Sequence, residues 1–285
     1  MAVERRGWWR LAAAYALAAL ALYFCVRYLG VHGGRFAEAI LHLSPARLAL
    51  AFGLFALGLG LNAGGFAFAN RALSATPSAR VLAGAWLATL LVKYVPVGIG
   101  HVLGRGLMLS RHGVSARATA WVGLFEQALS LALCVAIAVL AHAATEAAWR
   151  PLALGLALAG VGLLLGGAWW LRRRAVLRPM YWLAALACYA VAMLPYAGAY
   201  LTLVEPSEPL RFVQALFAGT VAGVLAVLVP GGLGVRESII AAWSGQDAAE
   251  AVLAGVVAAR GLILAAEALA SLIGHWMLRP RSEAS

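Results

Sequence analysis

The stretch Val229-Pro230-Gly231-Gly232-Leu233-Gly234-Val235-Arg236-Glu237 lies between two apolar runs of the chain. Pro230 cannot continue a helix, because its ring removes a hydrogen-bond donor and clashes with the preceding turn. The three glycines let the backbone turn tightly and expose its N–H groups. Charges beside broken backbone at membrane depth are costly unless they line a cavity or lie inside protein. The stretch is therefore either a turn within the membrane or an ordinary surface loop with Arg236 and Glu237 in water.

A second copy of this pattern occurs 134 positions earlier, at Val95-Pro96-Val97-Gly98-Ile99-Gly100. Both copies fit V-P-x-G-x-G, and an arginine follows each, Arg105 after the first and Arg236 after the second. Thirty residues after each proline a charge lies inside an apolar helix, Glu126 in one copy and Arg260 in the other. Weak internal symmetry of this kind is typical of membrane transporters that are built from repeats.

The composition predicts a polytopic membrane protein, because 64% of the residues are hydrophobic and only 12% are charged. No polar stretch exceeds about twenty residues, which is below the usual domain size. We therefore expect one membrane domain over residues 1–285, with repeats at about 10–141 and 152–278. Three arginines precede an apolar run that continues to about Leu29. This run is too long for a signal-peptide core, so it predicts an uncleaved first helix.

Six apolar runs reach the length of about 20 residues that a spanning helix needs. They are Leu11–Leu29, Leu48–Ala69, Ala118–Ala141, Leu152–Leu171, Tyr181–Val204 and Ala251–Leu278. Two shorter runs, Val81–Val95 and Phe212–Val229, lead into the proline motifs, and the short segments Ile99–Ser110 and Ser238–Ser244 follow them. A short arm, a Pro/Gly turn and a second short arm predict a re-entrant hairpin. We predict an all-α integral membrane protein with six full transmembrane helices and two such hairpins; the alternative is eight transmembrane helices.

Three crossings separate the hairpins, so the second must enter from the opposite face, which makes an inverted repeat. The positions of the arginines test this layout. With the N-terminus in the cytoplasm, thirteen arginines lie inside, and the five outside are Arg27, Arg35, Arg47, Arg150 and Arg211. This bias follows the positive-inside rule and predicts a bacterial inner-membrane protein with both termini cytoplasmic. The net charge of +11 is thus a topology signal rather than a sign of nucleic-acid binding.

Seven ionisable residues remain at or near the hairpins and the helices after them: Lys93, Arg105, Glu126, Arg236, Glu237, Arg260 and Glu267. A charge near the bilayer centre costs a few kcal/mol, so these side chains should face the protein interior and find partners. One interpretation is that they pair off and hold the hairpins against the helices. The other is a substrate-binding cavity, in which the cations and the turns bind an anionic head group. Those turn residues are Pro96, Gly98, Gly100, Pro230, Gly231, Gly232 and Gly234.

We predict no metal and no cofactor. The histidines near the motifs, His101 and His275, have no metal-ligand spacing with carboxylates, and they fit hydrogen-bonded core positions. The three cysteines, Cys25, Cys134 and Cys188, fall in apolar runs and fit buried small side chains.

Three strings carry a family resemblance: P-G-G-L-G-V-R-E at Pro230–Glu237, K-Y-V-P-V-G-I-G-H at Lys93–His101, and E-Q-A-L-S-L at Glu126–Leu131. They resemble the lysylphosphatidylglycerol synthase transmembrane-region family of flippase-like proteins, and the resemblance covers about residues 10–280. It implies a protein that moves or handles lipids or lipid-linked sugars, with Arg236 and Glu237 important. The full synthases add an aminoacyl-transferase domain; the chain ends at Ser285, so we expect a stand-alone member without it.

The first repeat departs from the family string, because Arg105 has no following glutamate and Pro96 has no paired glycine. We predict translocation of an anionic lipid or lipid-linked precursor between leaflets, with no catalytic residue and a membrane lipid as partner. One alternative is an intramembrane head-group transferase with Glu237 or Glu126 as base, although no nucleophile–base arrangement is visible. The other is an accessory subunit that presents lipid to a separate enzyme.

Overall fold

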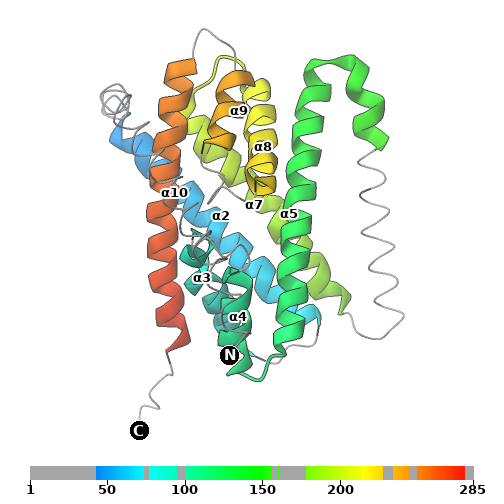
Figure 1. Ribbon diagram of the computed structural model, residues 1–285, viewed down its shortest axis with the longest axis vertical. Helices are drawn as coiled ribbons and strands as arrows, with labels where there is room; N and C mark the ends of the chain where they lie inside the picture. The colour runs from blue at the N-terminus through cyan, green and yellow to red at the C-terminus, as the bar shows by residue number, and fades with distance from the viewer. Residues whose placement is uncertain are drawn as a thin grey trace, which may run out of the picture.

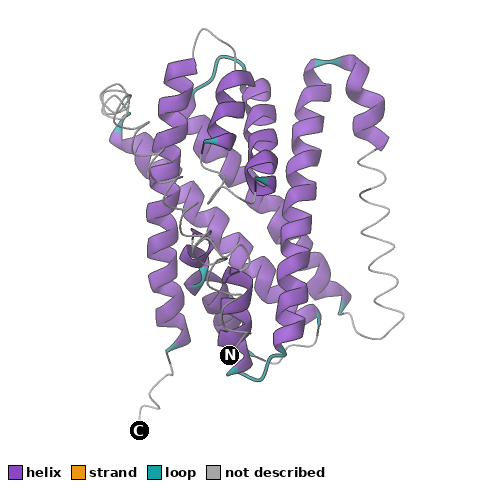
Figure 2. Ribbon diagram, viewed as in Figure 1, coloured by secondary structure: helices purple, strands orange, loops and turns teal. Residues whose placement is uncertain are grey.

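The structure, a computed structural model, describes residues 43–73, 77–94, 100–155, 160, 178–226, 234–243 and 249–279. Within these ranges the chain forms helices joined by turns, and none of the described residues belongs to a strand (Figure 2). Four helices are long and apolar enough to cross a membrane. The all-α prediction is confirmed for this part of the chain, and the lengths and composition of these helices are those of a membrane protein.

Each half of the chain begins and ends with a long helix, and its short helices lie between them in the sequence. In the first half these are α2 (Pro45–Ala72), α3 (Ala79–Ala88), the 3-10 helix η1 (Leu90–Tyr94), α4 (Gly100–Ser110) and α5 (Ala116–Thr145). In the second half they are α7 (Pro179–Val204), α8 (Pro209–Leu225), α9 (Val235–Trp243) and α10 (Ala249–Leu278). A short 3-10 helix, η2 (Ala147–Trp149), follows α5. The two halves correspond closely, because α7 begins 134 positions after α2 and the starts of the other helices keep nearly the same offset.

The long helices confirm that four of the expected apolar runs are helical, and they extend those runs by up to four residues at an end. The expected run Leu11–Leu29 lies outside the described residues, as does most of Leu152–Leu171, of which 152–155 are helical. The start of α2 shows why the ends extend. Ser44 Oγ accepts a hydrogen bond from the N–H of Arg47, and Pro45 occupies the first helical position, so the helix begins before its first apolar residue.

The first long helices of the two halves, α2 and α7, form a central pair that runs obliquely through the bundle in opposite directions (Figure 1). The last long helices, α5 and α10, stand on either side of this pair. The short helices exchange partners between the halves, since α3 packs mainly on α10 and α8 on α5. Each half therefore completes its packing with the last helix of the other half, and the halves form one interlocked body.

The two pairs of short helices occupy opposite ends of the bundle. In Figure 1, α3 and α4 lie in the lower half, and α8 and α9 lie in the upper half. At about 1.5 Å per residue the ten residues of α3 and the nine of α9 reach only about 15 Å, which is half the apolar thickness of a bilayer. Of the two proline motifs, residues 95–99 and 229–233 lie outside the described residues, and Gly100 and Gly234 at their ends are described.

Glycines allow the short helices to approach their neighbours closely. A Cβ on Gly84 of α3 would lie 3.3 Å from the carbonyl oxygen of Gly274 on α10, and a Cβ on Gly274 would collide with the backbone nitrogen of Ala88. In the second half, a Cβ on Gly219 of α8 would lie 2.9 Å from the carbonyl oxygen of Arg236 on α9. Contacts through small residues are the usual way in which membrane helices pack backbone to backbone.

Arginines gather unevenly at the two ends of the bundle. At the lower end of Figure 1 they flank the C-termini of α2, α4 and α10 and the N-termini of α3, α5 and α7: Arg71, Arg80, Arg111, Arg117, Arg178 and Arg279. At the upper end, among the described residues, are Arg47, Arg150 and Arg211. In the described part of the chain, the end that carries α3 and α4 is therefore the more basic one.

Candidate functional site

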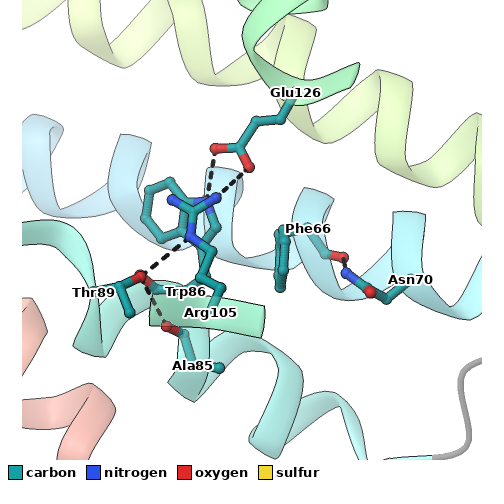
Figure 3. Close-up of polar contacts among 7 residues, drawn as sticks. All are labelled: Phe66, Asn70, Ala85, Trp86, Thr89, Arg105 and Glu126. Atoms are coloured by element: carbon teal, nitrogen blue, oxygen red, sulfur yellow. Dashed lines mark hydrogen bonds and ion pairs between the residues drawn. The ribbon is translucent and has the colours of Figure 1, made fainter. Parts of the chain in front are cut away.

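The predicted charges of the first half form a buried ion pair. Arg105 Nη1 of α4 donates to Glu126 Oε2 of α5 at 2.7 Å, and both side chains are buried (Figure 3). The remaining oxygen of Glu126 accepts a hydrogen bond from Trp86 Nε1 at 2.7 Å, and Arg105 Nε donates to Thr89 Oγ1 at 3.2 Å. Trp86 comes from α3, and Thr89 directly follows it. Side chains of the first hairpin arm thus complete the hydrogen bonding of the pair.

Two aromatic rings add to the stabilisation of Arg105. Its guanidinium carbon lies 5.1 Å from the ring centre of Phe66 on α2 and 5.2 Å from that of Trp86, within the range of cation–π attraction (Figure 3). The cation therefore has a carboxylate, a hydroxyl and two rings around it. A buried pair with this many partners anchors α4 to α2, α3 and α5, which is the structural interpretation of the charges.

The second half contains an ion pair of reversed polarity. Glu237 of α9 accepts a hydrogen bond from Arg260 Nε of α10 at 2.8 Å, with 12% and 16% of the two side chains exposed. The other carboxylate oxygen accepts from the N–H of Gly234 at 2.8 Å and caps the start of α9. Gly234 has a φ of 85°, a conformation that favours glycine, at the residue directly before α9.

The two pairs occupy equivalent places. Each joins the second arm of a hairpin to the long helix that follows, Arg105 to Glu126 in one half and Glu237 to Arg260 in the other. The cation lies on the hairpin in the first half and on the long helix in the second. Glu237 directs both carboxylate oxygens to other groups, Arg260 and the N–H of Gly234, and acts on its neighbour Arg236 only through the electrostatic field.

Arg236 therefore lies apart from the pairs. Its side chain is buried, with 7% of the residue exposed, and its guanidinium carbon lies 4.9 Å from the ring centre of Tyr200 and 5.5 Å from that of Tyr196. Tyr200 stands 134 positions after Phe66, so each repeat places an arginine over an aromatic ring at the same position of its first long helix. Among the described residues, Nε and Nη2 of Arg236 have no hydrogen-bond partner.

Side chains in and after the first short helix of each half explain why Arg105 and Arg236 have different surroundings. At the positions that correspond to Trp86 and Thr89, the second half has Thr220 and Gly223. The hydroxyl of Thr220 donates to the carbonyl oxygen of Leu216 at 2.7 Å within its own helix, and glycine has no side chain to offer. The helix α9 thus carries a buried cation, Arg236. The preceding helix α8 does not offer it side-chain partners like those that the first half offers to Arg105.

The unpartnered atoms of Arg236 have a defined geometry. Nε and Nη2 lie on one edge of the planar guanidinium, where their N–H groups point in parallel. This edge matches two oxygens of a carboxylate or a phosphate, and such bidentate pairing is among the strongest charge-assisted hydrogen bonding in proteins. The guanidinium carbon lies within 5.5 Å of both tyrosine ring centres, so the rings help to hold the group in place.

The remaining predicted residues are placed as follows. Glu267 is fully buried on α10 and takes part in an interaction inside the bundle. One turn later, Ser271 Oγ donates to the carbonyl oxygen of Ala88 at 3.2 Å, and His275 Nδ1 lies 2.8 Å from the carbonyl oxygen of Ser271. The backbones of Lys93 and Gly100 lie in η1 and α4, but the side chain of Lys93 lies outside the described part. Also outside it are Pro96, Gly98, Pro230, Gly231, Gly232, Cys25 and the side chain of His101.

Cys134 is buried as expected, and Cys188 is half-buried. In the part of the chain that the structure describes, no group of three or more histidine, cysteine, aspartate or glutamate side chains could hold a metal ion.

Sequence reasoning missed the neutral partners of the charges. Trp86, Thr89, Phe66, Tyr196 and Tyr200 lie in apolar runs, where aromatic residues and single threonines fit the core of any membrane helix. One signal was available, since Phe66 and Tyr200 are separated by the same offset as the two proline motifs.

No family model matches the chain, and no curated protein matches it. The resemblance to the lysylphosphatidylglycerol synthase transmembrane region stays a prediction.

Proposed function

We propose that the protein binds the anionic head group of a lipid at Arg236 and moves that lipid between the leaflets of the membrane. The observation that carries this proposal is the donor edge of Arg236, which is buried among apolar and aromatic side chains without a partner among the described residues. A buried cation in such surroundings is costly and marks a binding or transport site by default. A lipid phosphate supplies the two oxygens that this edge lacks.

Charge balance favours a head group with one negative charge. On the described residues of α9 and its partner Arg260, Glu237 and Arg260 neutralise each other, and the charge of Arg236 is the one we propose for the ligand. A phosphodiester carries one negative charge, so it would leave the bound site neutral. A phosphomonoester or a pyrophosphate would add a further negative charge, whose burial is costly without another cation. The first hairpin supplies no such cation from Arg105, because its guanidinium already pairs with Glu126.

The architecture supports movement of the ligand as well as binding. The pair α3 and α4 and the pair α8 and α9 lie at opposite ends of the bundle, and the halves interlock through α3–α10 and α8–α5. We propose that they are inverted repeats of six full spans and two re-entrant hairpins, which is the arrangement that lets a transporter open to one face and then to the other. In this proposal the arginine-rich lower end is cytoplasmic, and so are both termini of this inner-membrane protein.

The test uses purified protein in liposomes that contain lipids labelled on the head group. We expect faster leaflet exchange of a phosphodiester monoanion such as phosphatidylglycerol than of phosphatidic acid. Arg236→Lys should slow exchange about tenfold or more, because lysine keeps the charge but loses the planar fork. Arg211→Lys is the matched control, since Arg211 is exposed at the upper end of α8 and, among the described residues, pairs with Glu208 at 2.8 Å.

Mass analysis of the lipids after the assay separates the alternatives. A head-group transferase would generate lipids of altered mass, and an accessory subunit would leave both the mass and the leaflet unchanged. Either result, or equal exchange by Arg236→Lys and wild type, would contradict the proposal.

A further inference from the structure

The buried polar side-chain atoms that lack hydrogen bonds are gathered along one helix. Among the described residues they are Trp182 Nε1, Tyr189 Oη, Tyr200 Oη, and Nε and Nη2 of Arg236. The first three residues belong to α7, and Arg236 lies against the ring of Tyr200 on the same helix. Buried polar groups without partners are rare in native proteins, so their concentration on α7 calls for a physical cause.

These residues occupy one face of α7. The spacings from Trp182 to Tyr189 and from Tyr189 to Tyr200 are seven and eleven residues, which are close to two and three full helical turns. The line from Trp182 to Tyr200 extends about 27 Å along the helix axis, at about 1.5 Å per residue. Because α7 runs obliquely through the bundle in Figure 1, this line passes through the middle of the molecule from its lower part toward its upper part.

The packing neighbours of these three rings come from the first half of the chain. Trp182 packs on Phe125 of α5 with ring centres 4.4 Å apart, and the ring of Tyr189 lies against Gly65 of α2. Tyr200 meets Phe55 of α2 edge to face, with ring centres 5.6 Å apart. These contacts hold the rings through their apolar parts. They provide no acceptor for Trp182 Nε1 or Tyr189 Oη, so these two groups keep their capacity to donate; the hydroxyl of Tyr200 has that of Tyr196 beside it.

We infer that this face of α7 is the route along which the lipid head group crosses the membrane, with Arg236 as its charged binding point. The inference rests on the proposed function and extends it from a binding point to a path. A phosphate has several oxygen acceptors and no required donor, so a row of unpaired donors offers it successive hydrogen bonds. Each donor that replaces a lost water molecule lowers the barrier to moving a polar group through an apolar interior. The side chains fill this face in the present arrangement, so the head group would pass as the two halves shift along α7.

The test is Tyr189→Phe, which removes the hydroxyl and keeps the ring that packs on Gly65. We expect lipid exchange to fall by about two- to tenfold, the usual effect of one lost hydrogen bond. The melting temperature in detergent should stay the same or rise, since no described residue accepts a bond from this hydroxyl. Tyr181→Phe is the matched control on the same helix. Its ring packs on Phe68 and lies near Arg71, outside the proposed line, and exchange should be unchanged.

Unchanged exchange in Tyr189→Phe would overturn the path, and so would a fall in melting temperature, which would show that the hydroxyl has a structural bond. Trp182→Phe, which removes the indole N–H, tests the lower part of the line independently and should also slow exchange. Failure of the proposed function has a different signature, because the wild-type protein would then move no lipid or Arg236→Lys would move it normally. An active wild type, an impaired Arg236→Lys and an unimpaired Tyr189→Phe would refute the path alone.

Discussion

The hairpin of the first half and the hairpin of the second half place an arginine over equivalent aromatic rings, yet the two arginines have different surroundings. Arg105 is bonded to Glu126 and Thr89. Arg236 has two N–H groups without a described partner, because its neighbour Glu237 is bound to Arg260. The same scaffold thus holds a fully bonded arginine in one half and, in the other, a buried arginine that we propose is the binding group. Two halves with the same arrangement of helices can therefore differ in the bonding of equivalent charges. The difference here originates in a few side chains, Trp86 and Thr89 in the first half and Thr220 and Gly223 in the second.

The largest expected effect comes from breaking the anchor. Glu126→Ala removes the carboxylate and leaves Arg105 as an uncompensated buried charge, which should lower the free energy of unfolding by about 3–5 kcal/mol. The double variant Arg105→Met with Glu126→Leu should recover most of this loss, since it leaves no charge behind. Thermal unfolding in detergent measures both. Equal stability of Glu126→Ala and wild type would show that the pair is not an anchor.

A smaller effect is expected at the contact between α3 and α10, which holds the first hairpin in place. Gly274→Val puts a side chain where the backbone of α3 already lies, and it should destabilise the protein by about 3 kcal/mol. Gly261→Val on the same helix is the control, because a Cβ there would meet nothing within 4 Å. Similar melting temperatures for the two variants would mean that this close approach does not hold the hairpin.

The smallest effect should come from removing the hydroxyl of Thr89, which accepts a hydrogen bond from Arg105. Thr89→Val keeps the shape of the side chain and leaves Arg105 Nε without its acceptor, at a cost of about 1–2 kcal/mol. Lipid exchange per folded molecule should not change, since Arg105 is an anchor in this account. If Thr89→Val unfolds like the wild type but exchanges lipid slowly, Arg105 belongs to the binding site and is not a structural anchor.

Much of the fold could be predicted from the sequence, because long apolar runs and capping residues determine where membrane helices begin and end. The run Val81–Val95 shows the limit of this approach. It was expected to form one hairpin arm, but α3 ends at Ala88 and the chain continues as the 3-10 helix η1. Thr89 Oγ1 bonds back to the carbonyl oxygens of Ala85 and Trp86, a local competition that weakens the regular helix ladder.

The candidate site was only partly predictable. The proline motifs and their spacing predicted which charges lie inside the protein, including Arg105, Glu126, Arg236 and Glu237. They could not predict which charges pair, because partners on different helices depend on how the halves interlock. Nor could they predict that Tyr200 lies beneath Arg236, because a tyrosine in an apolar run also fits an ordinary core position.

The variant Arg236→Met distinguishes a binding group from a structural anchor when its stability and its lipid exchange are measured on the same preparation. Methionine fills a similar volume and removes two buried N–H groups that lack described partners. The account predicts a melting temperature equal to or above that of the wild type, together with loss of lipid exchange. A large fall in melting temperature with normal exchange by the molecules that remain folded would contradict it, because Arg236 would then be an anchor like Arg105.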